Sequence, residues 1–153
     1  MEEGTKCEID AVATLVGKFL PFYYPNLKFV EEGAHVLHTD NKSLVLVSPD
    51  GSLSQIEINS TKSEVTKLAC EFKCPCPTDY KTPVHYEIPQ RYIPQILGEM
   101  AALITPDLLY LSWTEESTIV IKAKFDEDLW NIKESEIKKL VWHSNTEKTY
   151  PHF

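Results

Sequence analysis

The sequence predicts a mixed α/β domain in which helices flank one central sheet. Apolar residues recur at helical spacing in three stretches, near residues 5–19, 91–104 and 126–142. Short strand-like runs fill most of the chain between these stretches. The length of 153 residues suits one unit. We therefore expect residues 1–153 to form a single domain, in which 143–153 is a polar tail.

The N-terminal part predicts a helix followed by a meander of strands. Thr5 has the capping-box spacing to Glu8, and Pro21 and Pro25 are expected to end the helix. Three strand-like runs follow, at residues 27–30, 34–38 and 43–48.

A turn then separates two expected strands. Pro49, Asp50 and Gly51 are turn-forming residues. Residues 54–59 alternate between polar and apolar, as a half-buried strand does. The pattern predicts that 43–48 and 54–59 pair as a hairpin and that a further strand covers 65–72.

The second half of the chain predicts a loop, a helix, a hairpin and a last helix. Residues 74–89 contain four prolines, which favour an irregular loop. The helix over 91–104 has Pro94 in its first turn, where proline is tolerated, and Gly98 allows close approach to a sheet. The remaining elements are strands at 107–114 and 118–125 and a helix at 126–142.

Charge and composition narrow the range of functions that fit this chain. The net charge is −8, with 23 acidic against 15 basic residues, and Arg91 is the single arginine. Broad adhesion to nucleic acid depends on neutralised phosphates, so this balance argues against a general coating protein. It does not exclude a nuclease, because a carboxylate-rich site is negative until metals bind it.

No apolar run is long enough for a membrane span, and the N-terminus lacks the apolar core of a secretory signal. We expect an intracellular protein of the cytoplasm or nucleus, without a membrane partner. The cysteines are then expected to be free thiols: Cys7, Cys70, Cys74 and Cys76. A zinc or iron–sulfur site is the less favoured alternative, because their spacing matches no good structural site.

Four polar residues stand at the ends of expected elements. Asp50 follows one strand, and Glu71 and Lys73 end another. Glu71 and Lys73 are two residues apart, so they share one strand face while Phe72 points into the core. Carboxylate oxygens select Mg²⁺ or Mn²⁺, and a lysine beside the ion can orient its water. With Gln95 in the next helix, the set predicts hydrolysis of a phosphodiester bond.

These motifs resemble those of the PD-(D/E)xK nuclease superfamily, and most of all its YqaJ-type viral recombinase branch, related to lambda exonuclease. The matching stretches are Ser48-Pro49-Asp50-Gly51, Glu71-Phe72-Lys73-Cys74-Pro75 and Tyr92-x-x-Gln95-x-x-Gly98-Glu99-Met100, with Gly4, Glu8 and Ala11 in the upstream helix. The resemblance implies a restriction-endonuclease-like core and a metal-dependent deoxyribonuclease. Members of that branch are typically exonucleases that act on linear duplex DNA in recombination.

The resemblance also implies a metal site. Asp50 and Glu71 would bind Mg²⁺ or Mn²⁺ with the backbone carbonyl of Phe72, and Glu8 would be an outer or second-metal ligand.

For substrate and catalysis, Lys73 would serve the nucleophilic water, and Gln95 would position water or phosphate. The candidate substrate-binding residues are Gln95, Tyr92, Arg91 and Ser48. The implied partners are double-stranded DNA ends, with further copies of the chain or a recombination protein as additional candidates.

Simpler interpretations stay open beside these roles. Asp50 can be a turn residue, Glu71 and Lys73 an exposed ion pair, and Glu8 a helix-capping acid. His85 is expected to be packed in its loop rather than bound to substrate. The alternative function is a catalytically inactive nuclease-fold module that binds DNA or protein.

Overall fold

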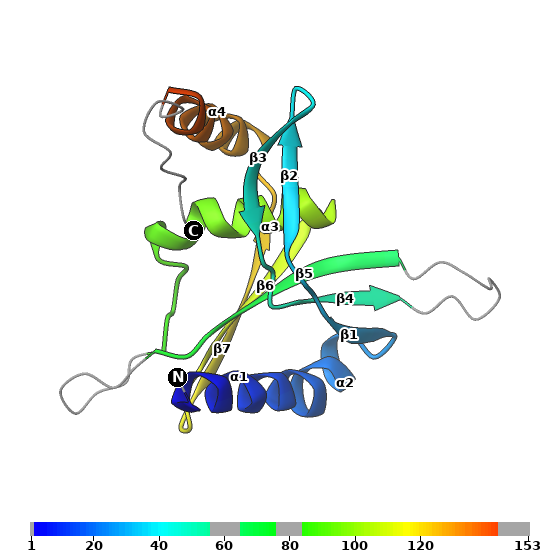
Figure 1. The fold of residues 1–153 in the computed structure, drawn as a ribbon. Helices are drawn as coiled ribbons and strands as arrows, with labels where there is room; N and C mark the ends of the chain where they lie inside the picture. Colours follow the sequence, from blue (N-terminus) through cyan, green and yellow to red (C-terminus); the bar gives the residue numbers. More distant parts are fainter. Residues whose placement is uncertain (1, 56–64, 76–83, 144–153) are drawn as a thin grey trace.

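A mixed sheet with helices on both faces forms the body of the molecule (Figure 1). The computed structural model describes the backbone of residues 2–55, 65–75 and 84–143, and the side chains of residues 6–55, 65–75 and 84–141. Within these ranges the sheet has five strands, in the order β1-β4-β5-β6-β7. Their bounds are Leu27–Glu31 (β1), Gly51–Gln55 (β4), Val65–Lys73 (β5), Asp107–Trp113 (β6) and Thr118–Lys124 (β7).

The pairing makes the sheet mixed. Strands β5 and β6 are parallel, and the other neighbours are antiparallel. The chain crosses from β5 to β6 through a loop, a short 3₁₀ turn at Gln90–Tyr92 and helix α3 (Ile93–Leu103). The expected α/β architecture with a central mixed sheet is confirmed at this level.

Each face of the sheet has its own core. Helix α1 (Glu2–Thr14) and the turns after it cover one face, and α3 covers the other (Figure 1). The buried residues on the α1 face are Ala11, Leu15, Leu20, Leu53, Leu68, Cys70, Phe72, Leu109 and Leu111. Those on the α3 face are Ala69, Ile96, Leu97, Met100, Leu108, Tyr110 and Trp130. Because strand side chains alternate, β5 directs Phe72 toward α1 and Glu71 toward α3.

The first helix differs from its prediction at both ends. It begins at Glu2, so Thr5 lies inside it rather than at its cap. It also continues past Pro21: a π-helical turn at Leu15–Phe19 leads directly into α2 (Leu20–Tyr23). Pro21 is the second residue of α2, and the π-helical turn directly before it departs from the regular i to i−4 bonding that a proline inside a helix would break.

The expected hairpin between 43–48 and 54–59 is wrong. Strand β3 (Lys42–Val47) pairs instead with β2 (His35–Thr39) in a separate two-stranded sheet, and β4 pairs with β1 and β5. The turn between β2 and β3 places Asp40 at φ 50° and Asn41 at φ 60°. A left-handed pair of this kind matches the twist of a tight hairpin, and Asp and Asn are among the residues that tolerate it. Residues 56–59 lie outside the described part.

Helix α4 (Glu127–His143) packs against this hairpin on the α3 side of the molecule (Figure 1). Ile137 joins a small core with Leu44, Val45 and Val47. At the start of α4, the Asp126 carboxylate accepts a hydrogen bond of 2.9 Å from the backbone N–H of Leu129. The expected strands 107–114 and 118–125 and the two later helices are confirmed, with Pro94 in the first turn of α3.

Two predicted segments fall mostly outside the described residues: 76–83 of the proline-rich loop, and 144–153 of the polar tail. In the part of the chain that is described, no helix combines the length and apolar character needed to cross a membrane.

Candidate metal and substrate site

Asp50 joins the start of β4 to the end of β5. It follows the buried Pro49 in the link from β3, just before the first residue of β4. Its Oδ2 accepts a hydrogen bond of 2.7 Å from the backbone N–H of Phe72. This bond brings the Asp50 carboxylate next to the backbone of the segment that carries Glu71 and Lys73. The predicted meeting of the first two motifs is thereby confirmed.

Gly51 makes this geometry possible by its lack of a side chain. It pairs with Glu31 on β1 and with Cys70 on β5. A Cβ atom here would collide with the ring of Phe29 and would lie 2.9 Å from the carbonyl oxygen of Val30. The close approach of β1 thus requires glycine immediately after Asp50.

Glu71, Lys73 and Gln95 form one hydrogen-bonded network. Glu71 Oε1 lies 2.9 Å from the Lys73 ammonium and accepts a hydrogen bond of 2.9 Å from the Gln95 amide nitrogen. Lys73 also donates to the Gln95 carbonyl oxygen at 3.4 Å. The strand-face prediction for Glu71 and Lys73 is confirmed. The alternative of an exposed surface pair is not, because the Glu71 side chain is only 3% exposed.

Glu99 extends this network, although no site role was predicted for it. It lies one helical turn after Gln95 on α3, is fully buried, and accepts a hydrogen bond of 3.1 Å from the Gln95 amide. A charged residue between the apolar positions Leu97 and Met100 was the available signal. Burial raises the pKa of Glu99 to about 10, helped by the charge of Glu71 nearby.

The second oxygens of Glu71 and Glu99 are both buried without a hydrogen-bond partner among the described residues. Such atoms are costly unless a proton, a water or a cation satisfies them. The acid cluster therefore stores unfavourable electrostatic energy.

The charged form of Asp50 is also electrostatically unfavourable. Burial raises the pKa of its carboxyl from 3.8 to about 7, and the charges of Glu71 and Glu8 raise it as well, while the Phe72 hydrogen bond opposes them. For Lys73, burial lowers the pKa, but the charge and hydrogen bond of Glu71 raise it by more. Glu8 is an exposed residue that acts on Asp50 as a nearby negative charge. The single positive charge of Lys73 does not balance the carboxylates of Asp50, Glu71 and Glu8 together.

The donor set fits a divalent metal. Glu71 Oε2, which has no hydrogen-bond partner among the described residues, and the Asp50 carboxylate are hard oxygen ligands of the kind that divalent metals prefer. In their present positions, however, the described residues include no group of three or more His, Cys, Asp or Glu side chains arranged to hold an ion. Metal binding would thus require the side chains around Asp50 and Glu71 to move from these positions.

Two of the predicted substrate-binding residues lie beside this network. The Lys73 ammonium stands 4.2 Å from the ring centroid of Tyr92, and the Arg91 guanidinium lies 4.6 Å from the same ring. Ser48, by contrast, is an exposed residue of the β3–β4 link, and no described contact joins it to the network.

The described cysteines are free thiols, as expected. Cys70 is buried in the core of the α1 face. Burial and the nearby Cys7 thiol raise the pKa of Cys74 to about 12. Cys76 lies outside the described residues, so the four-cysteine alternative stays a prediction.

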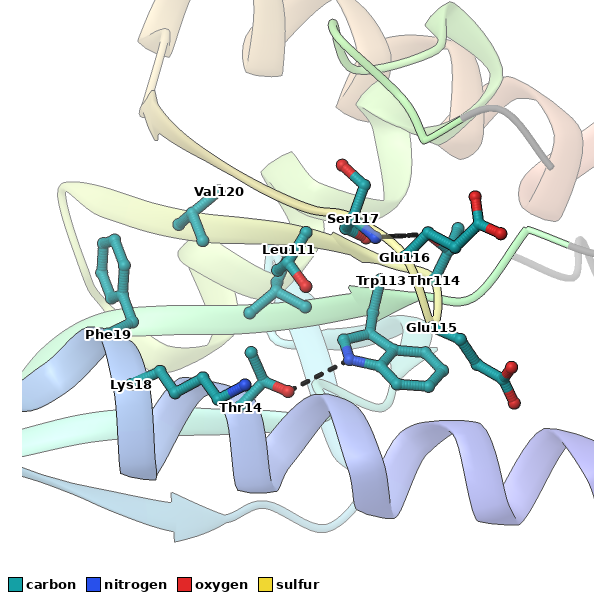
Figure 2. A pocket seen from close by; sticks show the side chains of 11 residues that line it. Thr14, Lys18, Phe19, Leu111, Trp113, Thr114, Glu115, Glu116, Ser117 and Val120 are labelled. Carbon is teal, nitrogen blue, oxygen red and sulfur yellow. Dashed lines mark hydrogen bonds between the residues drawn. The ribbon is translucent and has the colours of Figure 1, made fainter.

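A separate cavity of about 380 Å³ opens between the first helix and the β6–β7 hairpin (Figure 2). Phe19, Leu111 and Val120 form its apolar side, and the Trp113 indole donates a hydrogen bond of 3.1 Å to the Thr14 hydroxyl at its floor. None of the network residues lines it. The cavity belongs to the α1 face, whereas Glu71 points to the α3 face.

Comparison with known proteins adds information on the fold alone. No protein-family model and no curated protein matches this chain. A solved structure described as the crystal structure of SSO0001 superposes with a TM-score of 0.51 at 13% sequence identity. The match covers 98% of this chain and 62% of that one, so this chain corresponds to less than two thirds of its structural neighbour.

Proposed function

We propose that this chain is a metal-dependent deoxyribonuclease with a PD-(D/E)xK core, which hydrolyses phosphodiester bonds of linear duplex DNA. One observation carries the proposal. Asp50, Glu71 with Lys73, and Gln95 come from three separate segments beside a mixed sheet. Glu71, Lys73 and Gln95 bond to one another, and Asp50 accepts a hydrogen bond from the backbone N–H of Phe72, the residue between Glu71 and Lys73. The mixed sheet with a helix on each face is the frame that such a core needs.

Asp50, Glu71 and the Phe72 carbonyl would hold Mg²⁺ or Mn²⁺, with Glu8 as an outer ligand. A bound ion supplies an activated water and neutralises charge that develops on the phosphate. The ammonium of Lys73 has three donors. Glu71 and Gln95 engage two of them, and the nitrogen also lies 4.2 Å from the Tyr92 ring centroid, so a water or a phosphate oxygen would compete with that ring for the third. Gln95 holds Glu71 in place through the bond from its amide nitrogen.

The direct test measures release of labelled nucleotides from linear duplex DNA with Mn²⁺ or with EDTA. We expect nucleotides to be released with Mn²⁺ and not with EDTA. The rate of release should fall at least about 100-fold in Lys73→Ala and Asp50→Asn, because each substitution removes a group that stabilises the transition state. Lys124→Ala, at the far end of β7, is the matched control for loss of one lysine. Equal release by wild type and Lys73→Ala would end the catalytic assignment.

A catalytically inactive module that binds DNA or protein is the second candidate. The net charge of −8 favours it, as does the lack of a ready three-ligand group among the described side chains. Calorimetry separates the two: Mn²⁺ binding without cleavage of single- or double-stranded substrate would select the module.

The proposal also includes exonuclease action, assembly of several copies of the chain and an intracellular location. An exonuclease cuts linear duplex and spares the same DNA as a closed circle. Light scattering of the pure protein tests whether copies assemble, since a clean monomer at high concentration counts against an oligomer.

A further inference from the structure

A second group of side chains lies against Lys73. Tyr92 is its centre. The Lys73 ammonium and the Arg91 guanidinium both stack on the Tyr92 ring, at 4.2 Å and 4.6 Å from its centroid. Arg91 also donates a hydrogen bond of 3.3 Å to the Tyr92 hydroxyl. Cation–π contacts hold both cations at one aromatic ring.

His85 joins this group from the loop before α3. Its backbone N–H donates a bond of 2.9 Å to the Ser112 hydroxyl, and its Nδ1 lies 2.7 Å from the Tyr110 hydroxyl. Ser112 and Tyr110 are both fully buried on β6. The His85 ring lies 6.3 Å from the Tyr92 ring, so β6 fixes the histidine beside the two cations.

These contacts favour one tautomer of the neutral His85 ring. The buried Tyr110 hydroxyl has no hydrogen-bond partner other than His85 among the described residues. A buried hydroxyl proton needs an acceptor, so Tyr110 donates to Nδ1, and Nε2 becomes the N–H donor of a neutral ring. Among the described residues, Nε2 of His85 has no hydrogen-bond partner.

The charges around the histidine agree with this geometry. Burial lowers the pKa of His85, and the positive charges of Arg91 and Lys73 lower it further. No described carboxylate pairs with Arg91, the single arginine of a chain whose net charge is −8. Arg91 and the His85 Nε2–H therefore place a positive charge and a hydrogen-bond donor beside the Tyr92 ring, in an otherwise acidic molecule.

We propose that Lys73, Arg91 and the Nε2–H of His85 form a binding corner for a phosphate of a nucleic-acid strand, with Tyr92 as their common platform. The ligand's identity as a phosphodiester rests on the proposed nuclease function. The guanidinium fork and the neutral N–H donor suit a tetrahedral oxyanion, and Lys73 links this phosphate corner to the Glu71 carboxylate. Tyr110 is a positioning residue that orients His85.

The test is binding in EDTA, where cleavage lacks its metal. Fluorescence anisotropy at low salt follows a labelled linear duplex titrated with wild type, Arg91→Ala, Arg91→Lys, His85→Ala and Tyr110→Phe. We expect Arg91→Ala to weaken binding about tenfold and to reduce the salt slope by about one, with partial rescue in Arg91→Lys. His85→Ala weakens binding a few-fold, and Tyr110→Phe falls between it and wild type.

Lys124→Ala removes a positive charge at the opposite end of the sheet and is expected to bind as wild type does. Thermal melts establish that each variant folds; Arg91 is exposed, so its variants carry the test if His85→Ala does not fold. Wild-type binding by Arg91→Ala and His85→Ala overturns the phosphate corner, as does an equal loss in Lys124→Ala or no binding by wild type.

Two further arms separate the phosphate corner from the nuclease proposal and identify the phosphate. Binding that depends on Arg91, without Mn²⁺-dependent cleavage, sinks the nuclease and keeps the phosphate corner. Mn²⁺-dependent cleavage with unchanged Kd and KM in Arg91→Ala keeps the nuclease proposal and overturns the phosphate corner. Duplexes with 5′-phosphate and 5′-hydroxyl ends then distinguish sources: an Arg91 effect on both indicates an internal phosphodiester, and an effect on the first alone indicates the terminal phosphate.

Discussion

Asp50 shows how one residue serves the fold and the candidate site with opposite electrostatic demands. Its carboxylate caps the backbone N–H of Phe72, which favours the charged form. Burial and the neighbouring charges of Glu71 and Glu8 favour the neutral form, and they prevail, since the pKa rises to about 7. A divalent ion would reverse this balance by compensating the charges.

This balance predicts how stability depends on pH without divalent ions. The Asp50 carboxyl binds its proton more tightly in the folded protein than in the unfolded chain, because its pKa rises from 3.8 to about 7. Its contribution is therefore complete below about pH 4 and is lost as the pH rises through 7. Urea denaturation in EDTA should show a falling free energy of unfolding over this range, and a flatter profile in Asp50→Asn. Identical profiles for the two proteins would contradict the assignment.

At the scale of elements, the start of β4 has no room for a side chain at Gly51. Gly51 lies under the Phe29 ring of β1 and close to the Val30 carbonyl, while its neighbour Asp50 reaches β5. The strand pairing that builds the sheet thus also aims the first acid. The β2–β3 hairpin, in contrast, stands outside this sheet and contacts α4 and Gly98 of α3.

Gly51→Ala should therefore destabilise the protein by about 1–3 kcal/mol, because the added methyl group must displace an aromatic ring and a backbone carbonyl. Gly17→Ala is the matched control: it lies in the helical run, and an added Cβ would meet nothing within 4 Å, so we expect a neutral or slightly stabilising effect. Chemical denaturation measures both. Equal stabilities for the two variants would refute the packing account of Gly51.

At the scale of the whole molecule, α3 connects the layers. It packs Ile96, Leu97 and Met100 on the sheet, and it directs Gln95 and Glu99 toward Glu71 of β5. Buried carboxylates therefore lie inside the main core of a chain that already carries a net charge of −8. Cation binding at this point should stabilise the entire fold.

Thermal unfolding tests this coupling. A ligand that binds only the folded protein stabilises it by about 2.7 kcal/mol at 100 times its Kd. We expect Mn²⁺ to raise the Tm of wild type in a concentration-dependent way, and to raise that of Asp50→Asn much less. Both proteins melted in EDTA at the same pH provide the reference. An equal Mn²⁺ shift in both would place the ion elsewhere.

The sequence by itself determined the element order, the position of Pro94 and the shared face of Glu71 and Lys73. These follow from spacing along one segment, where helical and strand periodicity decide the outcome. It also identified Asp50 and Gln95 as candidate site residues, first from their residue types at the ends of expected elements and then from the resemblance of their motifs. Both signals come from short stretches of residues and do not depend on packing.

Only the tertiary structure decided which strands pair and what surrounds the acids. Strand β4 joins β1 and β5 rather than β3, because pairing depends on partners far away in the chain and on a left-handed turn at Asp40 and Asn41. The burial of Glu99 and the contact of His85 with Tyr110 arise from elements separated in sequence. Local patterns carry no record of such long-range contacts, whereas burial and the electrostatics of the site depend on them.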